Sequence, residues 1–90
     1  MRIQWSEDRV LALKCALQQY EDAESTGPDE YVADLYEAQP PLTLELAFEP
    51  QGVRVLAAES LAYDQEMDGW YLAGPVTDAA VIERALEGLL

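Results

Sequence analysis

The sequence contains no histidine, one cysteine and only five basic residues among 90. Without histidine, the chain cannot form the Ser–His or Cys–His pairs that nucleophilic catalysis commonly uses. Cys15 has no partner within the chain for a disulfide bond, which fits a reducing compartment. No apolar run approaches the roughly 18 residues of a membrane-spanning helix, and no Lys or Arg occurs between Lys14 and Arg54. We therefore expect a cytoplasmic protein that is not an enzyme and binds no cofactor.

Acidic residues dominate what is present. The chain has 18 Asp and Glu against 5 Lys and Arg, which gives a formal net charge of −13. Hydrophobic residues make up 50% of the chain, so we expect it to fold, as a single domain over residues 1–90. A strongly negative protein repels nucleic acid and anionic membranes and attracts basic proteins. The expected partner is therefore a larger basic protein of the kind that binds nucleic acid, and the chain itself is a monomer or a homodimer.

A long helix is predicted near the N-terminus. Ser6 has a side chain suited to capping a helix, and two acids follow it in the first turn, where the helix dipole favours them. From Glu7 to about Glu24, apolar residues recur with the spacing of an amphipathic helix. A smaller strip of Leu11 and Cys15 lies on another side of this helix, where it either widens the buried face or forms an exposed contact strip.

The most acidic part of the chain is predicted to include a second, short helix. A Gly-Pro pair ends the first helix, and residues 29–38 form the second helix before a Pro-Pro pair. With about 100° between successive residues, Glu30, Asp34 and Glu37 fall on one face of this helix. The apolar residues fall on another face, so the predicted helix has one side that is wholly acidic.

Strands are predicted in the second half. Residues 42–49 alternate between apolar and mostly polar side chains, which is the period of a half-buried strand, and a second strand begins at Val53. Asp68-Gly69 indicates a two-residue hairpin turn that pairs Met67 with Trp70. The predicted core face of this hairpin consists of Tyr63, Met67, Trp70 and Leu72.

A final helix, capped by Thr77 or Asp78, is predicted to run to about Glu87. The expected fold class is therefore α+β, with a three-stranded antiparallel β-sheet, helices packed on one face of it, and the element order α-α-β-β-β-α.

The carboxylates around the predicted second helix form the candidate binding surface. Phosphates recur about every 6–7 Å along a nucleic-acid strand, and acids three or four residues apart on a helix have β-carbons about 5–6 Å apart. Such a row can attract a basic groove that evolved for DNA or RNA. The candidate partner-binding residues are Glu21, Asp22, Glu24, Asp29, Glu30, Asp34 and Glu37, with Tyr31 and Tyr36 as aromatic anchors. A second acidic field on the outer face of the sheet comprises Glu45, Glu49, Asp64 and Glu66, with Tyr71 beside them.

Two other patterns have simpler explanations. The segment from Asp64 to Gly69 resembles the start of a calcium-binding loop, but Pro75 stands where that loop needs a bidentate Glu, and no helix precedes it. The hairpin interpretation explains the same residues better. Cys15 is most simply a structural thiol within a helix, and an exposed, reactive thiol is the alternative.

In its size, its charge, its lack of catalytic residues and its acidic run from Glu21 to Glu37, the chain resembles the small inhibitors that phages and mobile elements make against host defences. These include DNA-mimic anti-restriction proteins and anti-CRISPR proteins. The resemblance implies a non-enzymatic inhibitor that binds a basic surface of a larger host protein and blocks its access to nucleic acid. Two alternatives remain open: an immunity or antitoxin protein that neutralises a cognate toxin, and a homodimeric adaptor that uses Leu11, Cys15 and the open sheet face.

Overall fold

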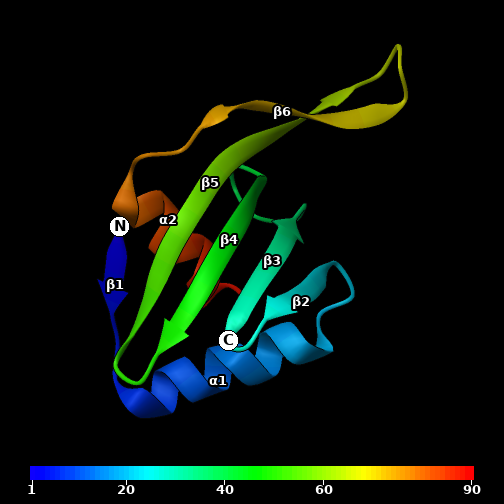
Figure 1. Cartoon of the computed structure of the whole chain (residues 1–90). Helices are drawn as coiled ribbons and strands as arrows, with labels where there is room; N and C mark the ends of the chain where they lie inside the picture. The colour runs from blue at the N-terminus through cyan, green and yellow to red at the C-terminus, as the bar shows by residue number, and fades with distance from the viewer.

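A computed structural model describes all residues from Met1 to Leu90 and shows an α+β fold with a six-stranded antiparallel sheet and two helices (Figure 1). In chain order the elements are β1 (Arg2–Gln4), α1 (Glu7–Gln19), β2 (Ala23–Gly27), β3 (Glu30–Leu35), β4 (Leu42–Glu49), β5 (Gly52–Asp64), β6 (Gly69–Pro75) and α2 (Ala79–Glu87). The predicted three-stranded sheet and the order α-α-β-β-β-α are therefore wrong, because most of the acidic segment predicted as helix forms strands.

The acidic segment after α1 is a β-hairpin. Gly27 pairs with Glu30, so Pro28 and Asp29 alone form the turn, and Asp29 has a φ of 58°. Proline followed by a residue with positive φ is the arrangement of a type II turn. Along β3, buried residues alternate with less buried ones, and this period of two fits a strand packed on one face. The inward residues of β3 are Tyr31, Ala33 and Leu35.

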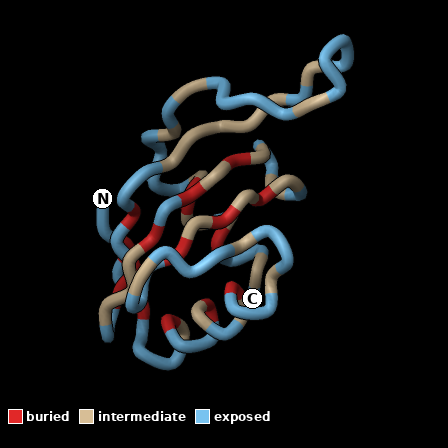
Figure 2. The backbone as a smooth tube through the Cα atoms, turned by 45° about the vertical axis from the view of Figure 1, so that its right-hand side comes forward, coloured by how far each residue is buried: buried red, intermediate tan, exposed pale blue.

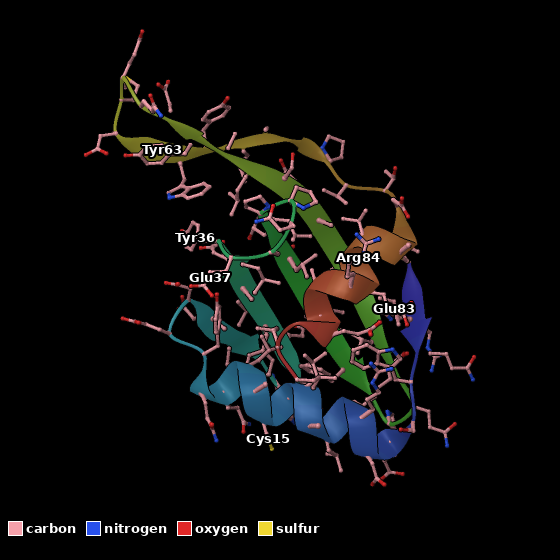
Figure 3. All side chains as sticks on the ribbon, turned by 180° about the vertical axis from the view of Figure 1, so that it is seen from behind. Cys15, Tyr36, Glu37, Tyr63, Glu83 and Arg84 are labelled. Carbon is pink, nitrogen blue, oxygen red and sulfur yellow. The ribbon has the colours of Figure 1, made fainter.

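The strands are arranged in the order β1-β5-β4-β3-β2, and β6 also pairs with β5. The long strand β5 pairs with β1 through its first residues and with β6 through its last ones. One face of the sheet packs against the helices, and α2 lies behind the sheet in Figure 1 and in front of it in Figure 3. No helix covers the opposite face, which we call the outer face.

A single apolar core holds these layers together. It contains 15 buried residues, contributed by both helices and by the inward-facing positions of the strands. Leu13 of α1, Leu44 and Leu46 of β4, and Ile82 and Leu86 of α2 are all at most 1% exposed. Figure 2 shows the buried positions concentrated in the body of the protein. The buried apolar side chains of the sheet are therefore on its inner face, and the charged side chains of its central strands lie on the outer face.

Several local predictions are confirmed. Ser6 caps α1 by accepting a hydrogen bond from the amide of Arg9, and Asp78 caps α2 by accepting one from the amide of Ala80. β4 spans the predicted residues, with the predicted alternation of burial in its first half. The first helix, however, ends at Gln19 and not near residue 24. The strip of Leu11 and Cys15 is exposed, so it does not widen the buried face.

The predicted hairpin between β5 and β6 exists, but its register is wrong. Asp64 pairs with Gly69 and Tyr63 with Trp70, so the loop has four residues. The side chain of Asp64 accepts hydrogen bonds from the amides of Glu66 and Met67, and this Asx-turn sets the longer loop. The predicted core face is also wrong, because Tyr63, Met67, Trp70 and Leu72 are all exposed.

The end of this hairpin extends beyond the rest of the sheet. The last pair between β4 and β5 is Leu42 with Ser60, and beyond it β5 continues with β6 as its only strand partner. We call residues 62–71 the arm. Figure 1 shows the arm projecting from the body, and Figure 2 shows no buried position along it. The protein measures 43 × 25 × 21 Å along its principal axes.

Replacing a central core residue is expected to destabilise the fold strongly. Leu44, at the centre of the sheet, is 1% exposed. Leu44→Ala should lower the free energy of unfolding by about 2–5 kcal/mol, because it removes buried methyl groups and leaves a cavity. Urea unfolding followed by circular dichroism measures this loss. As a control, Leu56→Ala, at a side chain that is 46% exposed, should change stability by only about 0.5 kcal/mol. Equal losses in the two variants would contradict this core assignment.

Candidate functional site

The outer face of the sheet brings together carboxylates from the two acidic fields that the sequence suggested separately. Across the strands, Glu24 of β2 lies beside Val32 of β3, and Val32 lies beside Glu45 of β4. Side chains of laterally paired residues point to the same face of a sheet, and neighbouring strands are about 4.8 Å apart. Glu24 and Glu45 therefore flank one apolar side chain on the same surface.

A second row of acids crosses the sheet next to the first. The amide of Asp34 donates to the carbonyl oxygen of Asp22 at 2.9 Å, which places these two residues opposite one another. Asp34 pairs with Thr43 of β4, and Thr43 pairs with Glu59 of β5. The two rows are one pleat apart, about 7 Å along the strands. We call the residues Asp22, Glu24, Asp34, Glu45 and Glu59 the acidic face.

The acidic face is hollowed at the free edge of β2. A shallow depression of about 200 Å³ lies there, lined mainly by the side chains of Glu21, Asp22, Glu24 and Asp34. None of these four carboxylates takes part in an ion pair. Like charges placed side by side on a sheet repel one another, so this part of the surface is held together by the backbone hydrogen bonds of the hairpin and by the core beneath it.

Two tyrosines border the acidic face. Burial raises the pKa of the Tyr20 phenol, and the carboxylates of Asp22 and Glu37 raise that pKa further. Burial also raises the pKa of the Tyr36 phenol, with the carboxylates of Asp34 and Asp22 acting in the same direction. Both phenols therefore stay protonated beyond the usual range, and their environment shows that the acids after α1 and after β3 converge.

The bases of the chain lie away from the acidic face or are already paired. Arg2 pairs with Glu49, Arg9 with Glu87, and Lys14 with Asp29. Arg54 is in the row that contains Glu30 and Ala47, toward the other end of the strands. Asp29 and Glu49, one from each predicted acidic field, are therefore already paired with bases. Glu30 points to the outer face but lies in the row that contains Arg54, outside the acidic face.

Other predicted site residues are placed differently from expectation. Tyr31, predicted as an exposed anchor, is 7% exposed, and its ring packs edge-on against Phe48. Its position in the core follows from the inward direction of alternate residues in β3, so Tyr31 cannot serve as a surface anchor. The predicted grouping of Glu30, Asp34 and Glu37 on one helical face is wrong, because Glu30 and Asp34 lie in a strand and Glu37 follows it.

Glu37 lies instead at a groove between the β3–β4 connection and α2. The groove has a volume of about 510 Å³, and Leu35, Ala38 and Leu89 form part of its apolar lining. Arg84 of α2 lines the same groove, which puts charges of both signs at its rim (Figure 3). The groove is thus less uniformly acidic than the outer face.

The remaining predicted residues are on or near the arm. Asp64, Glu66 and Tyr71 belong to it, and Tyr36 contacts it through the ring of Trp70, with ring centroids 4.9 Å apart. The acidic field predicted from Glu45, Glu49, Asp64 and Glu66 is therefore divided, since only Glu45 is on the acidic face.

Three surface residues were missed. Glu59 completes the second acidic row, and Tyr63 and Trp70 are exposed although the sequence placed them in a core. Glu59 could not have been found from the period-two alternation of β5, because that alternation gives Glu59 the same direction as the buried Val53 and Val55, and a β-bulge between Val55 and Ala57 reverses it. Trp70 and Tyr63 could not have been found either, because an aromatic pair at strand spacing looks the same whether it is buried or exposed.

No group of three or more Cys, Asp or Glu side chains is arranged to hold a metal ion. No helix is long and apolar enough to cross a membrane. In comparisons with known proteins, no family model, no curated protein and no solved structure matches this chain.

The two tyrosines give a test of this arrangement at high pH. The pKa of both Tyr20 and Tyr36 is raised, so the native state favours the protonated phenols. Their contribution to stability is complete below the usual tyrosine pKa of about 10 and is lost as the pH rises above it. Absorbance at 295 nm should show a late titration step that Tyr20→Phe and Tyr36→Phe each reduce. In 1 M salt the late step should move to lower pH, because the carboxylate part is screened. If each variant instead lost its amplitude near the usual tyrosine pKa of about 10 and kept the late step, this environment would be refuted.

Neutralising one carboxylate on the acidic face is expected to stabilise the protein. Asp34→Asn removes the repulsion between Asp34 and Asp22 and should raise the free energy of unfolding by about 0.2–1 kcal/mol. Asp8→Asn makes the same change of net charge at the first turn of α1, where a favourable interaction with the helix dipole is lost, and should lower stability by about 0.3–1 kcal/mol. Urea unfolding at low salt measures both. If both variants changed the free energy of unfolding in the same direction, total charge alone would determine stability.

Proposed function

We propose that this protein is a non-enzymatic inhibitor that binds the basic, nucleic-acid-binding surface of a larger protein through its acidic face and blocks the access of nucleic acid. The observation that carries the proposal is the convergence of unpaired carboxylates from four strands on a face that no helix covers. This surface is already assembled by the fold, so no ordering of the chain is needed before it meets a partner.

The spacing of the acidic face suits a surface built for phosphates. Asp22 and Asp34 face one another across two strands, about 5 Å apart, and Asp22 and Glu24 are one pleat apart, about 7 Å. Glu24 and Glu45, and likewise Asp34 and Glu59, are separated by one intervening strand, about 9–10 Å. The face therefore offers an array of negative charge whose separations span the spacing of phosphates along a nucleic-acid backbone. The alternation of residues in the strands produces this array, whereas the sequence had suggested a helix.

The charge of the whole chain supports the same partner. With a net charge of −13, the protein attracts a basic surface over distances of about one Debye length, roughly 8–10 Å in physiological salt. Such attraction mainly raises the association rate. The negative charge of the chain also disfavours the direct binding of nucleic acid. Because the protein and nucleic acid are both negatively charged, they compete for the same basic surface.

The proposed function is tested with variants of the acidic face. The partner is captured from host lysate on immobilised protein in 50 mM salt and is then assayed in purified form. Glu24→Lys with Glu45→Lys should weaken its binding by at least about 100-fold, because two attractive contacts become repulsive and each charged contact at an interface contributes 1 kcal/mol or more. Surface plasmon resonance measures the affinity. Saturating the partner with duplex DNA should displace the protein, and unimpeded binding to the DNA-saturated partner would contradict the blocking mechanism.

A control separates the acidic face from total charge. Ala12, Gln19, Gln51 and Ala80 are exposed, and none of them lies on the acidic face. Changing all four to Lys alters the net charge as much as the two reversals do. This control variant should retain most of the affinity. If it loses as much as the double reversal does, the acidic face is not the binding site.

A further inference from the structure

The arm concentrates the exposed apolar side chains of the protein. Nine large hydrophobic residues are exposed in the whole chain, and four of them, Tyr63, Met67, Trp70 and Tyr71, are on the arm. Leu72, which is 56% exposed, adjoins its base. Large exposed apolar clusters commonly mark interaction sites, and Trp and Tyr are the residues that most often carry interface energy. The body of the protein has no comparable cluster.

The arm is held in a defined conformation although it projects into solvent. Tyr63 and Trp70 pair across the two strands with ring centroids 5.4 Å apart in an edge-to-face arrangement. The ring of Tyr36 contacts Trp70 from the β3–β4 connection and supports the arm from the body. Asp64 orders the loop at the tip. A hairpin alone is only marginally stable in water, so these contacts indicate a surface that is preorganised for binding.

The arm is continuous with the acidic face. Tyr36 connects the two regions, because its ring contacts Trp70 and its phenol lies in the field of Asp34 and Asp22. Figure 3 shows Tyr36 between the arm that carries Tyr63 and the end of β3. A partner surface that covers the acidic face toward this end of the strands therefore also reaches the aromatic rings.

The charge of the arm determines the type of occupant. Asp64, Glu66 and Asp68 surround the tip, and no Lys or Arg occurs between Arg54 and Arg84. A second copy of the chain would bring these acids close to acids of its own kind. A cationic partner is therefore favoured, and the guanidinium group of arginine is suited to both parts of the arm, since it stacks on aromatic rings and pairs with carboxylates.

We propose that the arm is a docking element whose aromatic side chains take arginine side chains of the cationic partner. This inference rests on the proposed function, because it assumes the same basic partner. The acidic face supplies long-range attraction that does not distinguish arginine from lysine. The arm adds short-range contacts that favour arginine, so the protein prefers arginine-rich surfaces to lysine-rich ones of equal charge.

The test uses two peptides of equal charge, nona-arginine and nona-lysine, with the full-length protein. The native protein should bind nona-arginine about tenfold more tightly than nona-lysine, which is in the range of cation–π contributions. Met67→Ala with Tyr71→Ala should lower this ratio without changing the affinity for nona-lysine, and part of the preference should remain because Trp70, on the opposite face of the arm from Tyr71, is kept. Leu11→Ala with Leu56→Ala, two exposed apolar residues away from the arm, should leave the ratio unchanged. Isothermal titration calorimetry measures all six affinities.

Tryptophan fluorescence gives a second reading that does not depend on variants. Trp5 is 6% exposed and Trp70 is 44% exposed, so binding at the arm should shift the emission through Trp70, with nona-arginine and not with nona-lysine. Equal affinities for the two peptides in the native protein would overturn the role of the arm and leave the proposed function intact. Binding of neither peptide in 50 mM salt would overturn the proposed function as well. Self-association that depends on Tyr71 would identify a second copy as the occupant and also overturn the inference.

Discussion

The packing of both helices against one face of the sheet is the constraint on which the rest of the structure depends. Every strand residue must then point either into the core or into water, and the choice alternates along the strand. On β3 this places Tyr31, Ala33 and Leu35 in the core and leaves Asp34 outside. The hydrogen-bond register then aligns Asp34 with Asp22 and Thr43. The acidic face is thus a direct consequence of burying the apolar residues of the same strands.

The same constraint explains how a chain so rich in acids can fold. None of the 16 buried residues is charged, and no buried side-chain polar atom lacks a hydrogen-bond partner. The carboxylates that repel one another are solvated on the outer face, where water and salt weaken the repulsion. The energetic penalty of the acidic face is therefore limited to surface repulsion, which a well-packed core can offset.

Sequence patterns predicted the elements whose signals are local. The caps at Ser6 and Asp78 and the alternation of residues 42–49 each depend on a few neighbouring residues, and the structure agrees with all of them. The segment around Glu30 was misread because Gly-Pro can end one helix and start another or can form a hairpin turn. The sequence spacing of its apolar residues also fits both periods over so short a length. The pairing of β3 with β4 makes this segment a strand, and the local sequence does not reveal that pairing.

The candidate site was predicted in its composition but not in its geometry. The acids near residues 21–37 do contribute to the surface, but they are joined by Glu45 and Glu59 through strand pairing. In the arm, Asp-Gly signalled a hairpin correctly, while the side chain of Asp64 shifted the register by lengthening the loop. The partner of Trp70 changes from Met67 to Tyr63, an even number of residues, so Tyr63 and Trp70 stay on one face of the hairpin. That face is exposed because β4 ends before β5 does, which the local sequence does not reveal.

In the proposed function, the acidic face and the arm would act over different distances, which would give them different roles in recognition. Charges on the acidic face attract a basic partner before contact, and their effect weakens with salt. Aromatic contacts at Trp70 and Tyr71 act only after the surfaces meet, and they depend little on salt. Since Tyr36 contacts Trp70 and also lies beside Asp34, the two regions are fixed relative to each other. Under the proposed function, attraction toward the acidic face would deliver the partner to the arm in a defined orientation, and the selectivity of the complex would follow from the short-range contacts made there.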